Sequence, residues 1–181
     1  MKCLILFILL TFFATNSVAI AEEHVHSIHE DTANNDISPI NAVLKATIDE
    51  LGNSRSSVAA KIGKPLSIST EFVTNPNDPL HDNRIHTLYY DGIVIWIYQY
   101  TVNNKEKLLS VRITKSKKVL FSELIGKSEK YITSIFGQPT SFIKEKCIYD
   151  SLDDDESGLG IIELEFNKHS VDAVELTYYF D

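Results

Sequence analysis

The chain has 181 residues, a formal net charge of −8 and 44% hydrophobic residues, which suits one compact domain or two half-size modules that share a core. An acidic chain without concentrated Lys and Arg lacks the positive charge that binding to nucleic acid requires, so nucleic acid is excluded as a partner. One of the two cysteines lies in the N-terminal apolar segment, which leaves Cys147 without an intramolecular disulfide partner after export. The apolar flanks of Cys147 predict a buried thiol.

Residues 1–21 have the three parts of a secretory signal peptide. Lys2 precedes an apolar segment over residues 3–13, and the small-x-small sequence at 19–21 predicts cleavage before Glu22. The apolar segment is too short to span a bilayer comfortably, and no cysteine follows the cleavage region. The mature protein is therefore expected to be periplasmic or secreted, with no membrane span and no lipid anchor.

Residues 22–37 are polar, aperiodic and rich in His and Asn, which predicts a disordered N-terminal arm. Cleavage before Glu22 would make His24 the third residue of the mature chain. The free N-terminal amine, two backbone amides and the His24 imidazole would then form the square-planar set of four nitrogens that Cu(II) and Ni(II) prefer. His26 and His29 are close enough in sequence to add ligands. A copper or nickel site in the arm is one hypothesis, and a polar arm that merely contains histidines is the other. No cofactor is indicated elsewhere.

An amphipathic helix is predicted after the arm. Ser38 is the expected N-cap, Pro39 occupies the first helical position and Gly52 ends the helix. Its apolar stripe has the spacing of one helical face and consists of Ile40, Val43, Leu44, Thr47, Ile48 and Leu51. This stripe is expected to dock on the module that follows.

Two segments far apart in the chain share one template. Residues 52–65 align without a gap on residues 126–139, with glycines, serines and prolines at matching positions. Each segment predicts a short helix that begins at a serine N-cap, Ser54 or Ser128, and ends at a Gly-x-Pro sequence. Self-similarity of this kind indicates a duplicated module.

Strands are predicted after each of these helices. They lie at residues 66–74, 84–90, 93–101 and 108–114 in the first copy, and at 140–149, 160–167 and 171–180 in the second. The chain is thereby divided into a signal peptide (1–21), an arm (22–37), a helix with the first repeat (38–118) and the second repeat (119–181). The predicted fold class is α+β, with an N-terminal helix and two tandem helix-plus-antiparallel-sheet repeats that form one curved sheet with helices on one face.

The repeated template resembles the sequences of two related groups of proteins. Its pattern is a Gly, a polar residue at the start of a helix, Val or Ile one turn later, Ile/Phe-Gly-x-Pro and then a strand with an aromatic-Tyr sequence. One group is the small outer-membrane lipoprotein of the β-barrel assembly machine (the BamE, or SmpA/OmlA, family), and the other is the tandem-repeat β-lactamase-inhibitor-protein fold. The resemblance covers residues 51–179 and implies an exported, non-enzymatic module that binds other proteins on its sheet. The duplication and the lack of a lipidated cysteine favour the inhibitor-like architecture.

The predicted strand at 93–101 has the sharpest functional signal. Its alternation places three isoleucines on one face and the aromatic side chains of Trp96, Tyr98 and Tyr100 on the other. A sheet with helices on one side leaves its other face open to solvent, and rigid amphipathic aromatics there are typical of protein-binding surfaces. The alternative is a strand buried on both faces, with its aromatics in a core.

The same alternation in neighbouring strands places Arg112, Glu163 and Glu165 on the open face, beside the aromatics. Aromatic anchors with charges next to them indicate an interface, in which the charges set the register of the partner. The predicted function is therefore recognition of another exported or envelope protein, of the inhibitor or immunity type. The alternatives are an outer-membrane or envelope assembly factor and copper or nickel binding through the arm.

Catalytic motifs are missing from the sequence. It contains no nucleophile elbow, zinc-protease motif or phosphate-binding glycine loop, and His86 and His169 have no evident acid or nucleophile partner, so the protein is predicted not to be an enzyme. The acidic residues 153–158 resemble the start of a calcium loop, but Leu164 stands where a bidentate glutamate is needed. They are interpreted as an exposed acidic loop that attracts a basic partner.

Overall fold

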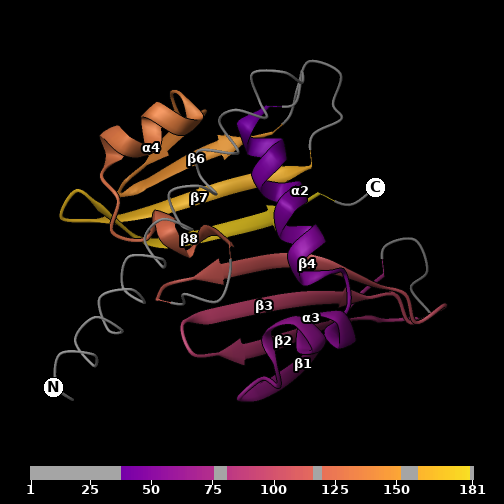
Figure 1. Cartoon of the computed structure of the whole chain (residues 1–181). Coiled ribbons are helices and arrows are strands. Elements are labelled where there is room, and N and C mark those ends of the chain that lie inside the picture. The colour runs from indigo at the N-terminus through magenta and orange to yellow at the C-terminus, as the bar shows by residue number, and fades with distance from the viewer. Residues whose placement is uncertain (1–37, 76–80, 116–119, 152–158, 180–181) are drawn as a thin grey trace, which may run out of the picture. The chain divides into compact units, whose positions relative to one another are not determined.

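A computed structural model describes residues 38–75, 81–115, 120–151 and 159–179 (Figure 1). The predicted signal peptide and arm, with His24, His26 and His29, lie outside these residues, as does the acidic loop at residues 153–158. The helices are α2 (Pro39–Leu51), α3 (Arg55–Ile62), the 3-10 helix η1 (Leu120–Leu124) and α4 (Glu129–Phe136). The strands are β1 (Ser67–Val73), β2 (Asn83–Tyr90), β3 (Ile93–Gln99), β4 (Glu106–Ile113), β5 (Ser141–Ile143), β6 (Lys146–Asp150), β7 (Gly160–Asn167) and β8 (Ser170–Tyr178).

All eight strands belong to one antiparallel sheet in the order β1-β2-β3-β4-β8-β7-β6-β5. Each repeat therefore contributes four strands that follow one another in the chain, and the last strands of the two repeats pair in the interior of the sheet. The β4–β8 pairing is short, from Ser110 opposite Thr177 to Ile113 opposite Val174. One sheet thus joins the two copies of the template.

The predicted α+β fold class is wrong. The described residues form a sheet-dominated fold with few helices, in which a single eight-stranded antiparallel sheet accompanies α-helices of 13, 8 and 8 residues. The serine cap and the Gly-x-Pro sequence limit each repeat helix to about two turns. Each repeat, by contrast, supplies four strands. The helices are therefore too short to form a layer that balances the sheet.

The strand predicted over residues 140–149 is a second correction, because it is a hairpin of β5 and β6. Lys144 at the turn has a positive φ of 57°, a conformation that a chain avoids without a turn signal such as Gly or Asn. The backbone N–H of Phe166 donates to the Glu145 carbonyl at 2.8 Å, which holds the turn against β7. The second repeat therefore has the same number of strands as the first.

Local capping follows the template in both repeats. Ser54 accepts a hydrogen bond from the Ser57 amide, and the Ser57 hydroxyl accepts one from the Ser54 amide, which completes a capping box. Ser128 caps α4 by accepting from the Tyr131 amide. Gly63 and Gly137 end the two helices with positive φ but with ψ of −175° and −153°, an extended backbone conformation that glycine adopts readily, and not the left-handed helical one.

The hydrophobic core lies on one face of the sheet. Ile93, Ile95 and Ile97 of β3 are at most 1% exposed, and Figure 1 shows α2 and α3 lying over the sheet. The Tyr178 hydroxyl of β8 donates to the Leu44 carbonyl of α2, so the helix is bonded to this face as well as packed on it. Each fully buried aliphatic side chain of this kind contributes about 1.5–3 kcal/mol.

The second repeat buries the same face. The ring of Phe136 on α4 lies 5.3 Å from the ring of Tyr149 on β6, and Ile132 is fully buried. Cys147 is also buried, as predicted, and burial raises the pKa of its thiol. The opposite side of the sheet, which we call the open face, has none of the described α-helices packed on it.

Candidate functional site

The six residues predicted as a binding site all lie on the open face. Their side chains are half-buried, and they alternate along their strands with fully buried residues of the core face. The strand register places Trp96 between Thr87 on β2 and Ser110 on β4. The set consists of Trp96, Tyr98, Tyr100, Arg112, Glu163 and Glu165.

Three aromatic side chains form one end of this site. The rings of Tyr98 and Tyr100 meet edge to face, with centroids 5.0 Å apart and planes inclined by 76°. The Asn83 side-chain amide donates to the Tyr98 hydroxyl at 2.5 Å, which fixes the ring against β2. The β3–β4 pairing shifts register just after Trp96, and such a bulge turns the local strand direction. These aromatics are therefore held in place before any partner arrives.

Five charged side chains form the other end, and we call them the charge network: Arg112, Lys146, Glu163, Glu165 and Glu175. Arg112 contacts Glu165 at 2.5 Å and Glu175 at 2.9 Å. Lys146 contacts Glu165 at 2.9 Å and Glu163 at 3.1 Å. The network thus crosses four strands, β4, β8, β7 and β6, and spans the boundary between the two repeats.

The electrostatics of the network follow from the strand register. Glu163 and Glu175 are direct cross-strand neighbours, an arrangement that costs free energy unless cations lie between the carboxylates. Hydrogen bonds from Arg112 and then from Lys146 lower the pKa of Glu165 to about 2. The same contacts raise the pKa of Arg112 and of Lys146. Three carboxylates meet two cations, so the network keeps one net negative charge.

Glu165→Gln is expected to destabilise the fold at neutral pH and to have little effect in acid. The folded pKa of Glu165, about 2, lies below its ordinary value of 4.5, so its carboxylate stabilises the folded state above pH 4.5. That stabilisation is lost as the pH falls from about 4.5 towards 2. Urea unfolding of wild type and of Glu165→Gln should therefore show that the difference between their free energies of unfolding becomes smaller as the pH falls through this range.

The matched control for this experiment is Glu145→Gln. Glu145 is exposed and has no ion pair among the residues that the structure describes, so its substitution should leave the pH dependence unchanged. A gap between Glu165→Gln and wild type that stays constant from neutral pH to pH 2 would contradict the ion-pair account.

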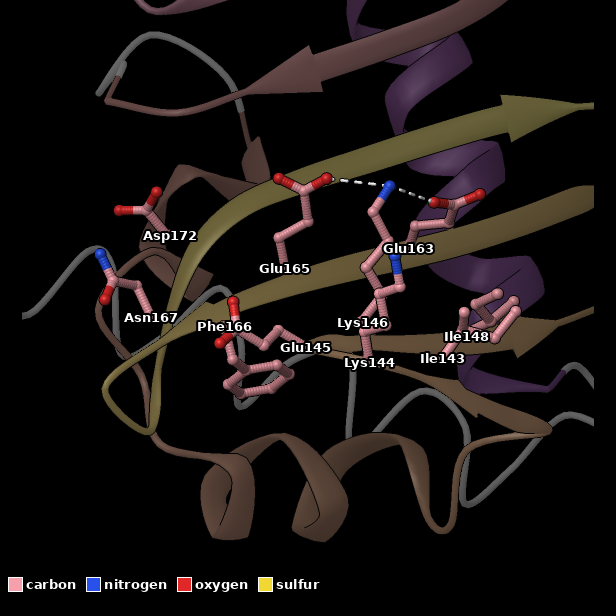
Figure 2. A pocket seen from close by; sticks show the side chains of 10 residues that line it. All are labelled: Ile143, Lys144, Glu145, Lys146, Ile148, Glu163, Glu165, Phe166, Asn167 and Asp172. Atoms are coloured by element: carbon pink, nitrogen blue, oxygen red, sulfur yellow. Dashed lines mark hydrogen bonds and ion pairs between the residues drawn. The ribbon is translucent and has the colours of Figure 1, made fainter.

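A hollow of about 760 Å³ continues the charge network towards the β5 edge (Figure 2). Its floor includes Glu163, Glu165 and Lys146, two of which belong to the predicted site. Apolar walls come from Ile143 and Phe166. The remaining lining residues are Lys144, Glu145, Ile148, Asn167 and Asp172. The open face is therefore flanked by a recess that combines four carboxylates and two lysines with apolar side chains.

Sequence reasoning missed Lys146 and Glu175 in the network. A period-2 count places Lys146 on the same face as Ile148, and Glu175 on the same face as Thr177. That signal was present, but which charges meet depends on strand order. The hollow was missed because it is formed beside the hairpin of β5 and β6, which the sequence prediction merged into one strand.

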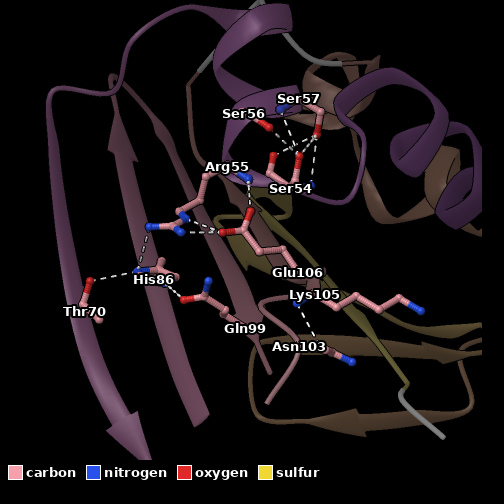
Figure 3. A network of polar contacts seen from close by, with 10 residues as sticks. All are labelled: Ser54, Arg55, Ser56, Ser57, Thr70, His86, Gln99, Asn103, Lys105 and Glu106. Carbon is pink, nitrogen blue, oxygen red and sulfur yellow. Dashed lines mark hydrogen bonds and ion pairs between the residues drawn. The ribbon is translucent and has the colours of Figure 1, made fainter. Parts of the chain in front are cut away.

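His86, which had no evident partner in the sequence, lies in a polar cluster on the core face (Figure 3). Its Nε2 lies 2.9 Å from the side-chain oxygen of Gln99, and its Nδ1 lies 2.8 Å from the Thr70 hydroxyl. With the proton on Nε2, the ring donates to Gln99, and Nδ1 accepts from Thr70 and from Arg55. Both ring nitrogens are satisfied, so His86 has a structural role in this arrangement.

Within the described ranges, no group of three or more His, Cys, Asp or Glu side chains is placed to hold a metal ion. The proposed copper or nickel ligands His24, His26 and His29 lie outside those ranges. A search of the same residues finds no helix with the length and apolarity needed to cross a membrane.

Comparison of the chain with family models, with curated proteins and with solved structures finds no match. The resemblance to the lipoprotein and inhibitor-protein groups therefore stays a prediction.

Proposed function

We propose that this chain is an exported, non-enzymatic recognition module that binds another exported or envelope protein on its open face, as inhibitors and immunity proteins do. One observation carries the proposal. The open face presents Trp96, Tyr98 and Tyr100 next to the charge network, and none of the described α-helices packs on it.

The aromatic end is suited to supply the affinity. Trp and Tyr side chains dominate the binding energy of protein interfaces because they bury a large area and lose little conformational entropy. Tyr98 is already held by Asn83 and by the Tyr100 ring, so binding has less side-chain freedom to remove.

The charged end is suited to supply specificity. Its side chains are fixed by mutual ion pairs across four strands, and a partner must present charges that match this pattern without leaving a buried charge unpaired. The hollow beside the network adds a recess lined by apolar side chains, by four carboxylates and by the two lysines Lys144 and Lys146, so its lining has an excess of negative charge. Such a recess suits a protruding side chain with an aliphatic stem and a basic end. The partner surface is thus expected to be apolar opposite β3 and basic opposite the hollow.

Trp96→Ala and Tyr98→Ala are each expected to leave the fold intact and to weaken binding by about 2 kcal/mol or more, which is roughly thirtyfold in affinity. The measurement is a pull-down from envelope and culture extracts with wild type and with the double mutant, followed by titration calorimetry with the captured protein. Circular dichroism and thermal unfolding establish that the mutants are folded.

The matched control is Tyr131→Ala, since Tyr131 is a half-buried tyrosine on α4, away from the open face. This variant should capture the partner as wild type does. A partner that the folded double mutant retains, or mutants that unfold because Trp96 and Tyr98 act as core residues, would contradict the proposal. The identity of the partner separates inhibition or immunity, where an enzyme or toxin is captured, from envelope assembly, where a resident outer-membrane component is captured.

A further inference from the structure

Among the described residues, no strand pairs with the outer edge of β1, which is the longer of the two edges of the sheet. β1 is first in the strand order, so the backbone groups on its outer side have no strand partner among the described residues. Ser67 to Phe72 are all exposed. An edge of this kind offers a row of N–H and C=O groups with which another strand can pair.

Most of the usual protections of an edge strand are missing from β1, in which Glu71 is the one charged residue. Its sequence contains no Lys, Arg or Pro, and its pairing with β2 runs over seven residue pairs without a register shift. The opposite edge of the sheet, β5, is only three residues long, and short length is itself a protection. β1 is therefore the edge of the sheet that is built to accept a strand.

Apolar side chains accompany the unpaired backbone. Leu66, Ile68 and Phe72 are 77%, 55% and 67% exposed. Ile68 lies opposite the buried Leu88 and Phe72 lies opposite Arg84, so both belong to the core face of the sheet, where they continue the apolar layer beyond its covered part.

The sequence of β1 is complementary to itself in an antiparallel pairing centred on Thr70. In that register Ile68 meets Phe72 of the second copy on the core face, and Ser69 meets Glu71 on the open face. A register centred on Glu71 would oppose two carboxylates and is disfavoured. The register centred on Thr70 opposes no like charges and pairs apolar with apolar residues.

We propose that β1 pairs antiparallel with β1 of a second copy of this chain about a two-fold axis at Thr70, so that two sheets become one continuous sheet. The two-fold operator closes the assembly as a dimer, because each copy has one such edge. The pairing uses the strand edge and leaves the open face free, so it stands independently of the function proposed above.

Sedimentation equilibrium of the purified chain over a concentration series tests the proposal. Wild type is expected to show the mass of two chains. Phe72→Lys and Ile68→Lys each place a cation opposite an apolar side chain at the dyad, and each is expected to weaken dimerisation at least tenfold. Val102→Lys is the matched control, because the side chains of Val102 and Phe72 are both 67% exposed but Val102 lies between β3 and β4, away from β1. This variant should remain dimeric.

Cross-linking gives a second readout that does not depend on weakening the dimer. Thr70→Cys places two thiols opposite each other at the dyad, and oxidised glutathione should convert them into a disulfide-linked dimer. Ser67→Cys is the control, since in this register its two copies lie about 20 Å apart. The protein is produced from Glu22 onward, which removes Cys3, and Cys147 is buried and does not compete.

Three results would overturn the proposal: a single-chain mass at every concentration, a dimer that both lysine variants leave intact, or equal cross-linking of the two cysteine variants. A dimer that dissociates in Phe72→Lys and Ile68→Lys, persists in Val102→Lys and cross-links through Thr70→Cys would support it.

Discussion

Gly160→Ala is expected to lower the free energy of unfolding by about 3 kcal/mol. A Cβ on Gly160 would lie 2.0 Å from the Thr177 carbonyl oxygen and 3.0 Å from the Tyr178 Cα, and both atoms belong to the backbone of β8. Gly160 pairs with Tyr178 at the start of β7. Because backbone atoms within a paired strand cannot move aside alone, the substitution must separate the β7–β8 ladder at this end.

Urea unfolding of Gly160→Ala beside Gly137→Ala separates crowding from backbone strain. Gly137 has a positive φ of 78°, but a Cβ there would meet no atom within 4 Å, so alanine at this position is expected to cost about 1 kcal/mol. Equal losses in the two variants would show that the approach of β8 is not the cause.

Glu106→Ala is expected to destabilise the fold by about 2 kcal/mol, the second largest effect. Glu106 on β4 accepts from the backbone N–H of Arg55 at 2.8 Å and from the Arg55 Nε at 2.6 Å (Figure 3). Its side chain is 12% exposed, so little water replaces these bonds when the carboxylate is removed. The substitution also takes a negative charge from the N-terminus of α3, where the helix dipole favours it.

A double-mutant cycle with Arg55→Ala measures this interaction, and the two substitutions together should cost less than the sum of their separate costs. Glu145→Ala serves as the control, because Glu145 is exposed and forms no ion pair among the described residues, so its substitution should change the stability only slightly. Strict additivity of Glu106→Ala and Arg55→Ala would mean that the contact does not join α3 to β4.

The features that the sequence predicted well are local ones. Ser54, Ser128, Gly63 and Gly137 act on backbone groups within about four residues, so the template alone located both repeat helices. The alternation along β3 likewise needs no knowledge of neighbouring strands, and the structure places Trp96 and its companions on the open face as that alternation predicted.

The features that escaped prediction are non-local or lack a turn signal. The bond between Arg55 and Glu106 joins residues 51 positions apart, and nothing in either neighbourhood indicates the other. The charge network required the strand order, which depends on the pairing of β4 with β8. The turn at Lys144 contains neither Gly nor Asn, so β5 and β6 were read as one strand, and the extent of the sheet was underestimated.

The position of β8 has a consequence for how the protein is made. β8 follows every other strand in chain order, yet it lies between β4 and β7 in the interior of the sheet. While the chain emerges from a ribosome or a translocation pore, the first repeat can fold before β8 is available. Until then, β4 has an unpaired and largely apolar edge, and so does β7. The sheet is thus completed when β8 inserts between two halves that have already formed. The incomplete chain is therefore most susceptible to aggregation and proteolysis in the interval before β8 emerges.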